Sequence, residues 1–298
     1  MNLRELEYLV AVDEERHFHR AAQRCFVSQP TLSGQLKKLE QELGVLLVER
    51  SNRQVNMTDV GKAVADQARR VLGEARLIGE IVGSFDDPMA GELHLGLIPT
   101  VAPYLLPWFM KPLAEHYPRL KLWLYEYQTH VLLQKLRRAE LDVLILALPV
   151  DTEEFAQLEL YSEPFLLAVP VTEQLASHEL ISLTDLNGKE VLLLEEGHCL
   201  RGQALDICFS AGAHETRGFH ASSLETLRHM VGEGMGMTLM PGLAVPEIRR
   251  KGDTVLYLRF SDPQPQRRIG MVYRRGSYRE PAFSRIAEII REKVLPIT

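Results

Sequence analysis

The chain has little cysteine, with three in 298 residues. Three thiols cannot form the dense disulfide framework of small secreted proteins, so they favour a reducing compartment, where a disulfide is transient or sensory. No apolar run approaches the roughly 20 residues of a membrane span, and the acidic start MNLRELEYLV is unlike a secretory signal. We therefore expect a cytoplasmic protein with no membrane partner.

Positive charge is also in deficit, because 34 Lys and Arg residues face 40 Asp and Glu residues and leave a formal net charge of −6. DNA repels such a chain on average, so nucleic-acid binding needs a local surface without acids. Hydrophobic residues make up 46% and charged residues 25%, as in ordinary globular proteins. The length predicts two domains, with the larger one subdivided.

Residues 1 to 58 predict a compact helical domain with a small wing. Apolar residues recur at helical spacing in LEYLVAV, and AAQRCF and LSGQLKKLEQELG follow closely, as in a helix-turn-helix. Ser28 is a predicted N-cap, Pro30 lies near the start of the next helix, and Gly44 is a predicted stop. The segment SNRQVNMT combines β-branched and turn residues, which favours a wing.

The stretch VSQPTLSGQLKK contains no acid and predicts the DNA-reading surface. Hydroxyls and amides on a helix in the major groove reach base edges, while lysines reach phosphates. The candidates are Ser28, Gln29, Thr31, Ser33, Gln35, Lys37 and Lys38. The acid-free loop from Arg50 to Arg53 is predicted to hold the neighbouring phosphate backbone. A protein-interaction helix is the alternative, because many helical hairpins carry a lysine pair.

A long helix is predicted from Thr58, with apolar residues that alternate four and three apart. A heptad seam does not stabilise an isolated helix, so we expect this helix to dimerise. The alternative is that the seam packs against the helix's own domain. The seam consists of Val64, Ala68, Val71, Ala75, Ile78, Val82 and Phe85, and the polar residues on the other faces include Asp66, Arg69, Arg70 and Glu74. Residues 86 to 91, which contain Asp86-Asp87-Pro88, are predicted to form a linker.

After Gly91, strand patterns alternate with helical ones, which predicts an open, mainly parallel α/β sheet. The predicted strands are GELHLGLIP, LKLWLYEY, LDVLILALP, EPFLLAVP, KEVLLLEE, MGMTLMP and RRIGMVYR, and FSRIAEIIREKVL is an amphipathic last helix. This length suits two lobes with a cleft, and such sheets bind ligands at the C-terminal ends of their strands. Thr100 and Thr129 lie at two such ends, although each alone is also explained as a helix N-cap.

Two of the three cysteines lie in GHCLRGQALDIC, from Gly197 to Cys208. Gly197 is a predicted turn, and LRGQALDICFSAG predicts a short helix, so Cys199 lies at or just before a helix N-terminus. Unpaired N–H groups there favour a thiolate. The charges of Arg201 and a protonated His198 act in the same direction, whereas Glu195 and Glu196 oppose it unless they point away.

Cys208 is predicted to be buried and less reactive, because the apolar side of this helix contains Leu200, Ala204, Ile207, Cys208 and Ala211. Within one helix the α-carbons of Cys199 and Cys208 are about 13 Å apart at about 1.5 Å per residue. A disulfide needs less than about 7 Å. A bond therefore requires the helix to unwind, and Gly202 weakens it by about 1 kcal/mol relative to alanine. A thiolate that meets hydrogen peroxide becomes a sulfenic acid, which a second cysteine resolves.

Simpler interpretations exist for these residues. A lone cysteine is usually a small buried hydrophobe, which is our interpretation of Cys25. His198, Cys199 and Cys208 lack a familiar metal-ligand spacing, so no metal and no cofactor is expected. The scattered histidines are interpreted as structural or surface groups, and only His130, beside Thr129, is kept as a site candidate; the others are His116, His214, His220 and His229.

The sequence AAQRCFVSQPTLSGQLKKLEQELGVLLVER, followed by MTDVG, resembles the winged helix-turn-helix of LysR-type transcriptional regulators. With the heptad helix and the α/β region, the resemblance covers essentially the whole chain. It implies an all-α winged helix-turn-helix over residues 1–58, a dimerising linker helix over 59–88 and a two-lobed α/β, periplasmic-binding-protein-like regulatory domain over 89–298. Lobe I would span 89–162 and 268–298, and lobe II 163–267.

The LysR resemblance also implies site residues and partners. Its recognition motif matches Ser28, Gln29, Pro30, Thr31, Ser33 and Gln35, and its wing matches Arg50 and Arg53. The implied partners are a double-stranded DNA operator, a second copy in a homodimer or homotetramer, and RNA polymerase.

Within that family, GHCLRGQALDICFSAGA, LIPTVAPYLLP, QTH and ASSLETLRHMV closely resemble the peroxide-sensing OxyR subgroup. The resemblance implies that Cys199 is the peroxidatic thiol and Cys208 the resolving thiol, reset by a thioredoxin- or glutaredoxin-like reductant. It places Thr100, Thr129, His198 and Arg201 around hydrogen peroxide. It also implies an arginine before IGMVY, for which Arg267 and Arg268 are equal candidates.

Three other classes stay open. One is a LysR regulator that responds to a small organic effector in the cleft between the lobes. The second is an enzyme such as a thiol peroxidase, and the third is a transport-type binding receptor. A recognition helix serves neither of the last two, so we expect a regulator and no enzyme.

Overall fold

The computed structural model describes residues 1–50, 55–84, 87–216, 218–219, 221–246, 248 and 252–294, without the side chains of 50, 79–80 and 82–84. The chain divides into two compact units, one of residues 1–87 with 137–140 and one of 88–136 with 141–298. Separate hydrophobic clusters form the cores of these units.

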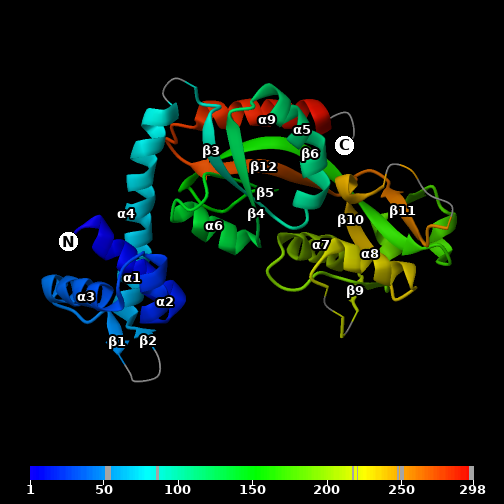
Figure 1. Cartoon of the computed structure of the whole chain (residues 1–298). Helices are drawn as coiled ribbons and strands as arrows, with labels where there is room; N and C mark the ends of the chain where they lie inside the picture. Colours follow the sequence, from blue (N-terminus) through cyan, green and yellow to red (C-terminus); the bar gives the residue numbers. More distant parts are fainter. Residues whose placement is uncertain are drawn as a thin grey trace. The chain divides into compact units, whose positions relative to one another are not determined.

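The first unit is the predicted winged helix-turn-helix, followed by a long helix (Figure 1). Its elements are α1 (Leu3–Glu15), α2 (Phe18–Arg24), α3 (Gln29–Leu43), β1 (Val48–Arg50), β2 (Val55–Met57) and α4 (Asp59–Ser84). The predicted caps of α3 are confirmed: Ser28 accepts a hydrogen bond from the Thr31 N–H at 3.3 Å, and Gly44 ends the helix with φ +70°. Strands β1 and β2 pair antiparallel and form the wing.

Helix α4 has a different environment at each end. Near its start, Ala65 and Ala68 are buried within the first unit, so this half packs on its own domain. Further along, Val71 and Ile78 of the predicted heptad seam are 38% and 67% exposed. The side chain of Val82, together with Phe85 and Asp86, lies outside the described residues.

Arg69, one of the polar residues outside the heptad seam of α4, is buried against α1. Its side chain is only 7% exposed and forms ion pairs with Asp13 and Glu14 of α1 and with Asp66 of α4. The acids of α1 lie more than 50 residues away along the chain and are not visible in the local pattern around Arg69.

The second unit is built on one eight-stranded sheet in the order β4-β3-β5-β12-β6-β11-β7, with β10 also paired to β6. The strands are β3 (Gly91–Leu97), β4 (Leu120–Glu126), β5 (Val143–Leu148), β6 (Phe155–Pro170), β7 (Leu180–Ile181), β10 (Thr238–Pro241), β11 (Val255–Phe260) and β12 (Gln266–Arg274). The prediction of a mainly parallel sheet holds for β4, β3 and β5. It is wrong for β12, β10 and β11, which pair antiparallel with β6.

Two hydrophobic cores divide this unit into two lobes. The core of the first lobe draws on residues 89–161 and 269–294, and the core of the second lobe on 165–260. Strand β6 runs through both lobes (Figure 1). In the first lobe, α5 (Ala102–His116) and α9 (Glu280–Val294) lie together on one face of the sheet, with α6 (Thr129–Arg137) on the other.

The second lobe departs most from the sequence prediction. It contains α7 (Cys199–Ser210), α8 (Leu224–Gly232), the pair β8 (Glu190–Val191) and β9 (His214–Glu215), and the 3-10 turns η1 (Gln174–Ser177), η2 (Leu183–Leu186) and η3 (Gly242–Ala244). Of the predicted strand KEVLLLEE only β8 forms, and an isolated bridge from Leu194 to Ala221 holds the remainder of that segment. Strand β11 and helix α8 were not predicted.

Candidate redox site and nucleic-acid interface

Cys199 is the first residue of α7, as predicted. Gly197 turns the chain with φ +95°, and His198 is the N-cap in an extended conformation whose own side chain accepts no hydrogen bond from the first turn. The Cys199 side chain is half-buried and packs against the core of the first lobe, although α7 belongs to the second lobe. The peroxidatic candidate therefore lies where the two lobes of the second unit meet.

Cys208 is fully buried in the core of the second lobe, as predicted. Burial raises the pKa of its thiol from 9.0 to about 12, so it is protonated at neutral pH. Both cysteines are free, and α7 is continuous between them. Nine helical steps separate their α-carbons by about 13 Å, beyond the reach of a disulfide.

A buried polar cluster joins Thr100, Glu163 and Arg267. Arg267 donates from Nη1 to the Thr100 hydroxyl at 3.1 Å, from Nη2 to the Thr100 carbonyl at 2.9 Å, and from Nε to Glu163 Oε1 at 2.9 Å. The three residues are 2%, 0% and 3% exposed in sequence order. Sequence reasoning missed Glu163, because a single acid beside a proline looked like the edge of the predicted strand EPFLLAVP.

This cluster distinguishes the two candidate arginines. Arg267 points into the protein, whereas the Arg268 side chain is 52% exposed and pairs with Glu159 at 3.4 Å. Adjacent residues of a strand point to opposite faces, so only one of them reaches Thr100. Of the two candidates, Arg267 is therefore the one that lies with Thr100 and Glu163.

Neither threonine is the helix N-cap that was the alternative explanation. Thr100 precedes α5, whose N-cap is Val101, and its hydroxyl accepts from Arg267. Thr129 is the first residue of α6, and its buried hydroxyl has no hydrogen-bond partner in the described part of the chain. Both hydroxyls thus occur in buried places that helix capping does not explain.

The start of α6 lies beside the loop that leads into Cys199. The Gln128 side-chain amide donates to the Glu196 carbonyl at 3.4 Å, and a Cβ on Gly197 would lie 2.3 Å from Gln128 Oε1. His198 is 8% exposed, and its Nε2 lies 3.8 Å from Glu195, so this acid does not point away. Thr129 and His198 therefore come from adjoining segments.

Arg201 and His130 do not join these groups. Arg201 binds both oxygens of Glu215, at 2.7 and 2.9 Å, and the Leu194 carbonyl at 2.9 Å; the hydrogen bond to Glu215 raises the pKa of the guanidinium. His130 is exposed. Within the described residues no hydrogen bond or ion pair links either side chain to Thr100 or Arg267. His116, His214 and His229 are exposed, and His220 lies outside the described residues.

The predicted DNA-reading side chains lie on α3 and on its N-cap, Ser28. Ser28, Gln29, Pro30, Thr31 and Lys37 are exposed, and Ser33 and Gln35 are half-buried. On the opposite side of α3, leucines 32, 36 and 39 fill the core of the first unit.

Lys38, the second predicted phosphate contact, is 63% exposed and pairs with the buried Glu5 of α1 at 3.3 Å. Arg53 and the side chain of Arg50 lie outside the described residues.

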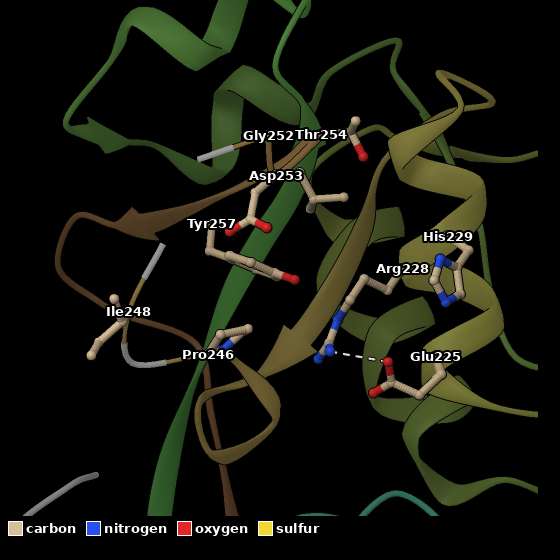
Figure 2. Close-up of a pocket in the computed structure, with 10 residues that line it drawn as sticks. Glu225, Arg228, His229, Pro246, Ile248, Gly252, Asp253, Thr254 and Tyr257 are labelled. Atoms are coloured by element: carbon tan, nitrogen blue, oxygen red, sulfur yellow. Dashed lines mark hydrogen bonds and ion pairs between the residues drawn. The ribbon is translucent and has the colours of Figure 1, made fainter. Parts of the chain in front are cut away.

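A cavity of about 820 Å³ lies in the second lobe, between α8 and β11 (Figure 2). Arg228 and Glu225, both on α8, pair at 3.0 Å, and Asp253 and Tyr257 lie on the β11 side. All its lining residues fall between 225 and 257, so it is not the cleft between the lobes that the organic-effector alternative requires.

Neither a membrane span nor a metal site occurs in the described part of the chain. No helix there is both long enough and apolar enough to cross a membrane. In the same residues, no group of three or more His, Cys, Asp or Glu side chains is placed to hold a metal ion.

Comparison with known families agrees with this architecture. A family described as "Bacterial regulatory helix-turn-helix protein, lysR family" matches residues 3–62, and a "LysR substrate binding domain" matches residues 86–295. The fold and the site thus define a transcriptional regulator with a winged helix-turn-helix and a two-lobed α/β regulatory domain. The chain belongs to the LysR family.

The similarity to OxyR proteins extends over nearly the whole chain. The DNA-binding transcriptional dual regulator OxyR of Escherichia coli (strain K12) is 50% identical over 294 residues, which cover 99% of this chain and 96% of that one. Full-length OxyR C199D from Pseudomonas aeruginosa matches with a TM-score of 0.78 at 39% identity, over 98% of both chains. The oxidized form of OxyR matches with a TM-score of 0.64 at 48% identity, over 70% of this chain and 97% of that one. The predicted resemblance to this subgroup is confirmed.

Proposed function

We propose that this protein is a cytoplasmic, hydrogen-peroxide-sensing DNA-binding regulator of oxidative-stress defence genes, switched by a reversible disulfide between Cys199 and Cys208. The observation that carries the proposal is one continuous helix with a half-buried thiol at its first residue and a fully buried thiol nine residues later. Relatives named hydrogen peroxide-inducible genes activator support it, among them that of Haemophilus influenzae at 48% identity over 298 residues.

The chemistry proceeds in two balanced steps. The Cys199 thiolate attacks one peroxide oxygen; the S–O bond forms, the O–O bond breaks, and the leaving hydroxide takes a proton to become water. Cys208 then attacks the sulfenic sulfur, the S–S bond forms, and a second water leaves. A thioredoxin- or glutaredoxin-like dithiol reverses the change by thiol–disulfide exchange.

The peroxide pocket that we propose contains Thr100, Thr129, His198 and Arg267. Buried hydroxyls and a guanidinium are donors suited to a small polar oxidant, and His198 adjoins the thiol in sequence. Because Arg201 is committed to Glu215 and both His130 and Arg268 are exposed, we leave these three out of the pocket.

The DNA-binding function rests on the first unit. We infer that α3 enters the major groove of a double-stranded operator with Ser28, Gln29 and Thr31, and that Lys37 and the wing arginines contact phosphates. The exposed seam residues of α4 fit a dimer interface, within a homodimer or homotetramer. This assigns residues 1–58 to DNA, 59–88 to dimerisation and 89–298 to sensing and, in the activated form, to RNA polymerase.

Mass spectrometry after a brief micromolar peroxide pulse tests the proposal. We expect a Cys199–Cys208 disulfide in the wild type, and a trapped sulfenic acid at Cys199 in the Cys208→Ser variant. Cys25 is the internal control, because it lies in the first unit and has no predicted redox role. If Cys199 stays a free thiol in catalase-free samples, the proposal is wrong.

The rival classes give different results in solution. An organic-effector regulator would bind a ligand between the lobes without thiol oxidation. Because a dithiol also resets the sensor, peroxide consumption alone does not separate it from a thiol peroxidase, whereas operator-DNA binding that changes on oxidation is expected only of the regulator. We infer a regulator rather than an enzyme, because a winged helix-turn-helix serves no peroxidase reaction.

A further inference from the structure

Glu163 is a buried carboxylate with a separate partner for each oxygen. Its side chain on β6 is 0% exposed. Oε1 accepts from Arg267 Nε at 2.9 Å, and Oε2 accepts from the Leu243 backbone N–H at 2.8 Å. Both oxygens are therefore satisfied, as the burial of a charged carboxylate demands.

The contacts of Glu163 determine where the Arg267 guanidinium points. A guanidinium is planar, so holding its Nε edge fixes the direction of both terminal nitrogens. With Nε on Glu163, those nitrogens reach the hydroxyl and the carbonyl of Thr100. Residues 163 and 267 are also direct neighbours in the β6–β12 register, so the backbone places the pair.

Glu163 lies where β6 passes from one lobe to the other. Tyr161, two residues earlier, belongs to the core of the first lobe, and Phe165, two residues later, to that of the second. Leu243, whose N–H it accepts, follows β10 of the second lobe, and its side chain packs against the first-lobe core. Cys199 packs against the first-lobe core, which also contains Ile98 and Val101 on either side of Thr100. A carboxylate here ties the arginine to both lobes.

We propose that Glu163 is a positioning residue for the oxidation of Cys199, acting through Arg267. It holds the guanidinium against Thr100 through Nε and Nη2, so that the N–H left on Nη1 donates to the peroxide oxygen that leaves as hydroxide and is protonated to water. This inference rests on the proposed function. It adds a residue that touches neither peroxide nor thiol.

Three possible roles for Glu163 predict three different effects of its removal on the reactions of Cys199. If Glu163 only supplies negative charge, its removal leaves the positive charge of Arg267 without a counter-ion, and Cys199 reacts faster with peroxide. If it only supports the fold, its removal changes every reaction of Cys199 alike. If it positions Arg267, the peroxide reaction slows, and a reaction that does not use the arginine is unchanged.

The experiment measures two rate constants for Cys199 in the full-length reduced protein: oxidation by hydrogen peroxide and alkylation by iodoacetamide. For Glu163→Gln we expect the peroxide rate to fall about tenfold or more, as when a donor to developing charge is misplaced, with alkylation within about twofold of wild type. The matched control is Glu159→Gln, which breaks the exposed Arg268 pair between the same two strands. Both of its rates should match the wild type.

Two further variants keep the test decisive. Glu163→Asp retains the charge but shortens the side chain, so it should also slow peroxide selectively, even if the glutamine variant does not fold. In an Arg267→Met background, Glu163→Gln should cause no further loss, because the arginine carries the effect. An unchanged or faster peroxide rate, or equal losses with both reagents, overturns the positioning role alone. A wild-type Cys199 inert to peroxide overturns both this role and the proposed function.

Discussion

Replacing Gly202 with alanine should slow disulfide formation about fivefold and leave the reaction of Cys199 with peroxide unchanged. Gly202 lies inside α7, its φ is not in the left-handed region, and a Cβ there meets nothing within 4 Å. Alanine therefore adds no clash and stabilises the helix by about 1 kcal/mol. If α7 must unwind before Cys208 reaches Cys199, the unwound population falls by the same free energy, which is about fivefold.

The ionisation of Cys208 gives a second reason for unwinding. With a pKa of about 12 in the folded lobe, only about one thiol in 10⁵ is a thiolate at pH 7. At the ordinary value of 9.0 the fraction is about one in a hundred. Leaving the core thus raises the nucleophile concentration about a thousandfold. Resolution of the sulfenic acid should therefore follow the unwound population and not the folded one.

Quenched-flow mass spectrometry with enough peroxide to make the first step fast separates the two stages. The sulfenic acid should persist about five times longer in Gly202→Ala than in the wild type. Gly34→Ala is the matched control: it also removes a helical glycine with open space around it, but in α3 of the first unit. Resolution at the wild-type rate in Gly202→Ala would show that α7 need not unwind, and the proposed switch would lose its physical basis.

Three further predictions concern stability. Burial raises the pKa of Cys208 from 9.0 to about 12, so the stabilisation by the buried thiol is complete below pH 9 and is lost as pH rises towards 12. Between pH 8 and 10 the free energy of urea unfolding of the reduced protein should fall by about 1.4 kcal/mol more than that of Cys208→Ala, and identical pH dependence in the two proteins would contradict this. Arg69→Met should lower the free energy of unfolding by about 2 kcal/mol, less than for a fully buried pair because Glu14 and Asp66 are partly exposed. The control is Arg70→Met at an exposed position, and equal unfolding midpoints for the two variants would refute the prediction. Phe26 is 95% exposed with φ +56°, so Phe26→Asn should relieve backbone strain without loss of buried area and raise the free energy of unfolding by about 1 kcal/mol. A variant that is less stable than the wild type would contradict the assignment of strain to this residue.

Local signals predicted the parts of the molecule that local chemistry determines. Ser28 and Gly44 cap α3 because their side-chain and backbone preferences act within a few residues. Cys199 begins α7 and Cys208 faces the core because a glycine turn and a helical apolar pattern lie close together in the sequence. These features needed no knowledge of distant segments.

Pairing between distant segments was not predictable in the same way. The residues of a strand do not show whether it pairs parallel or antiparallel. The prediction of a parallel sheet therefore rested on the helices between strands, and it missed the antiparallel pairs of β6 with β10, β11 and β12. Strand alternation shows that Arg267 and Arg268 point to opposite faces, but only the register against Glu163 shows which one is buried. Glu163 itself has no local signal, because its partners are 80 and 104 residues away.

The packing of α7 bears on reduction as well as on oxidation. Unwinding that exposes Leu200 and Cys208, both buried in the second lobe, costs about 3 kcal/mol of lost burial. That cost destabilises the disulfide state relative to the dithiol state. For a two-electron couple, about 1.4 kcal/mol corresponds to about 30 mV, so the packing raises the reduction potential of the disulfide by about 60 mV. The burial that keeps Cys208 unreactive in the reduced fold therefore also makes the disulfide easier for a cellular dithiol to reduce. A more stable α7 would both slow disulfide formation and shorten the lifetime of the disulfide.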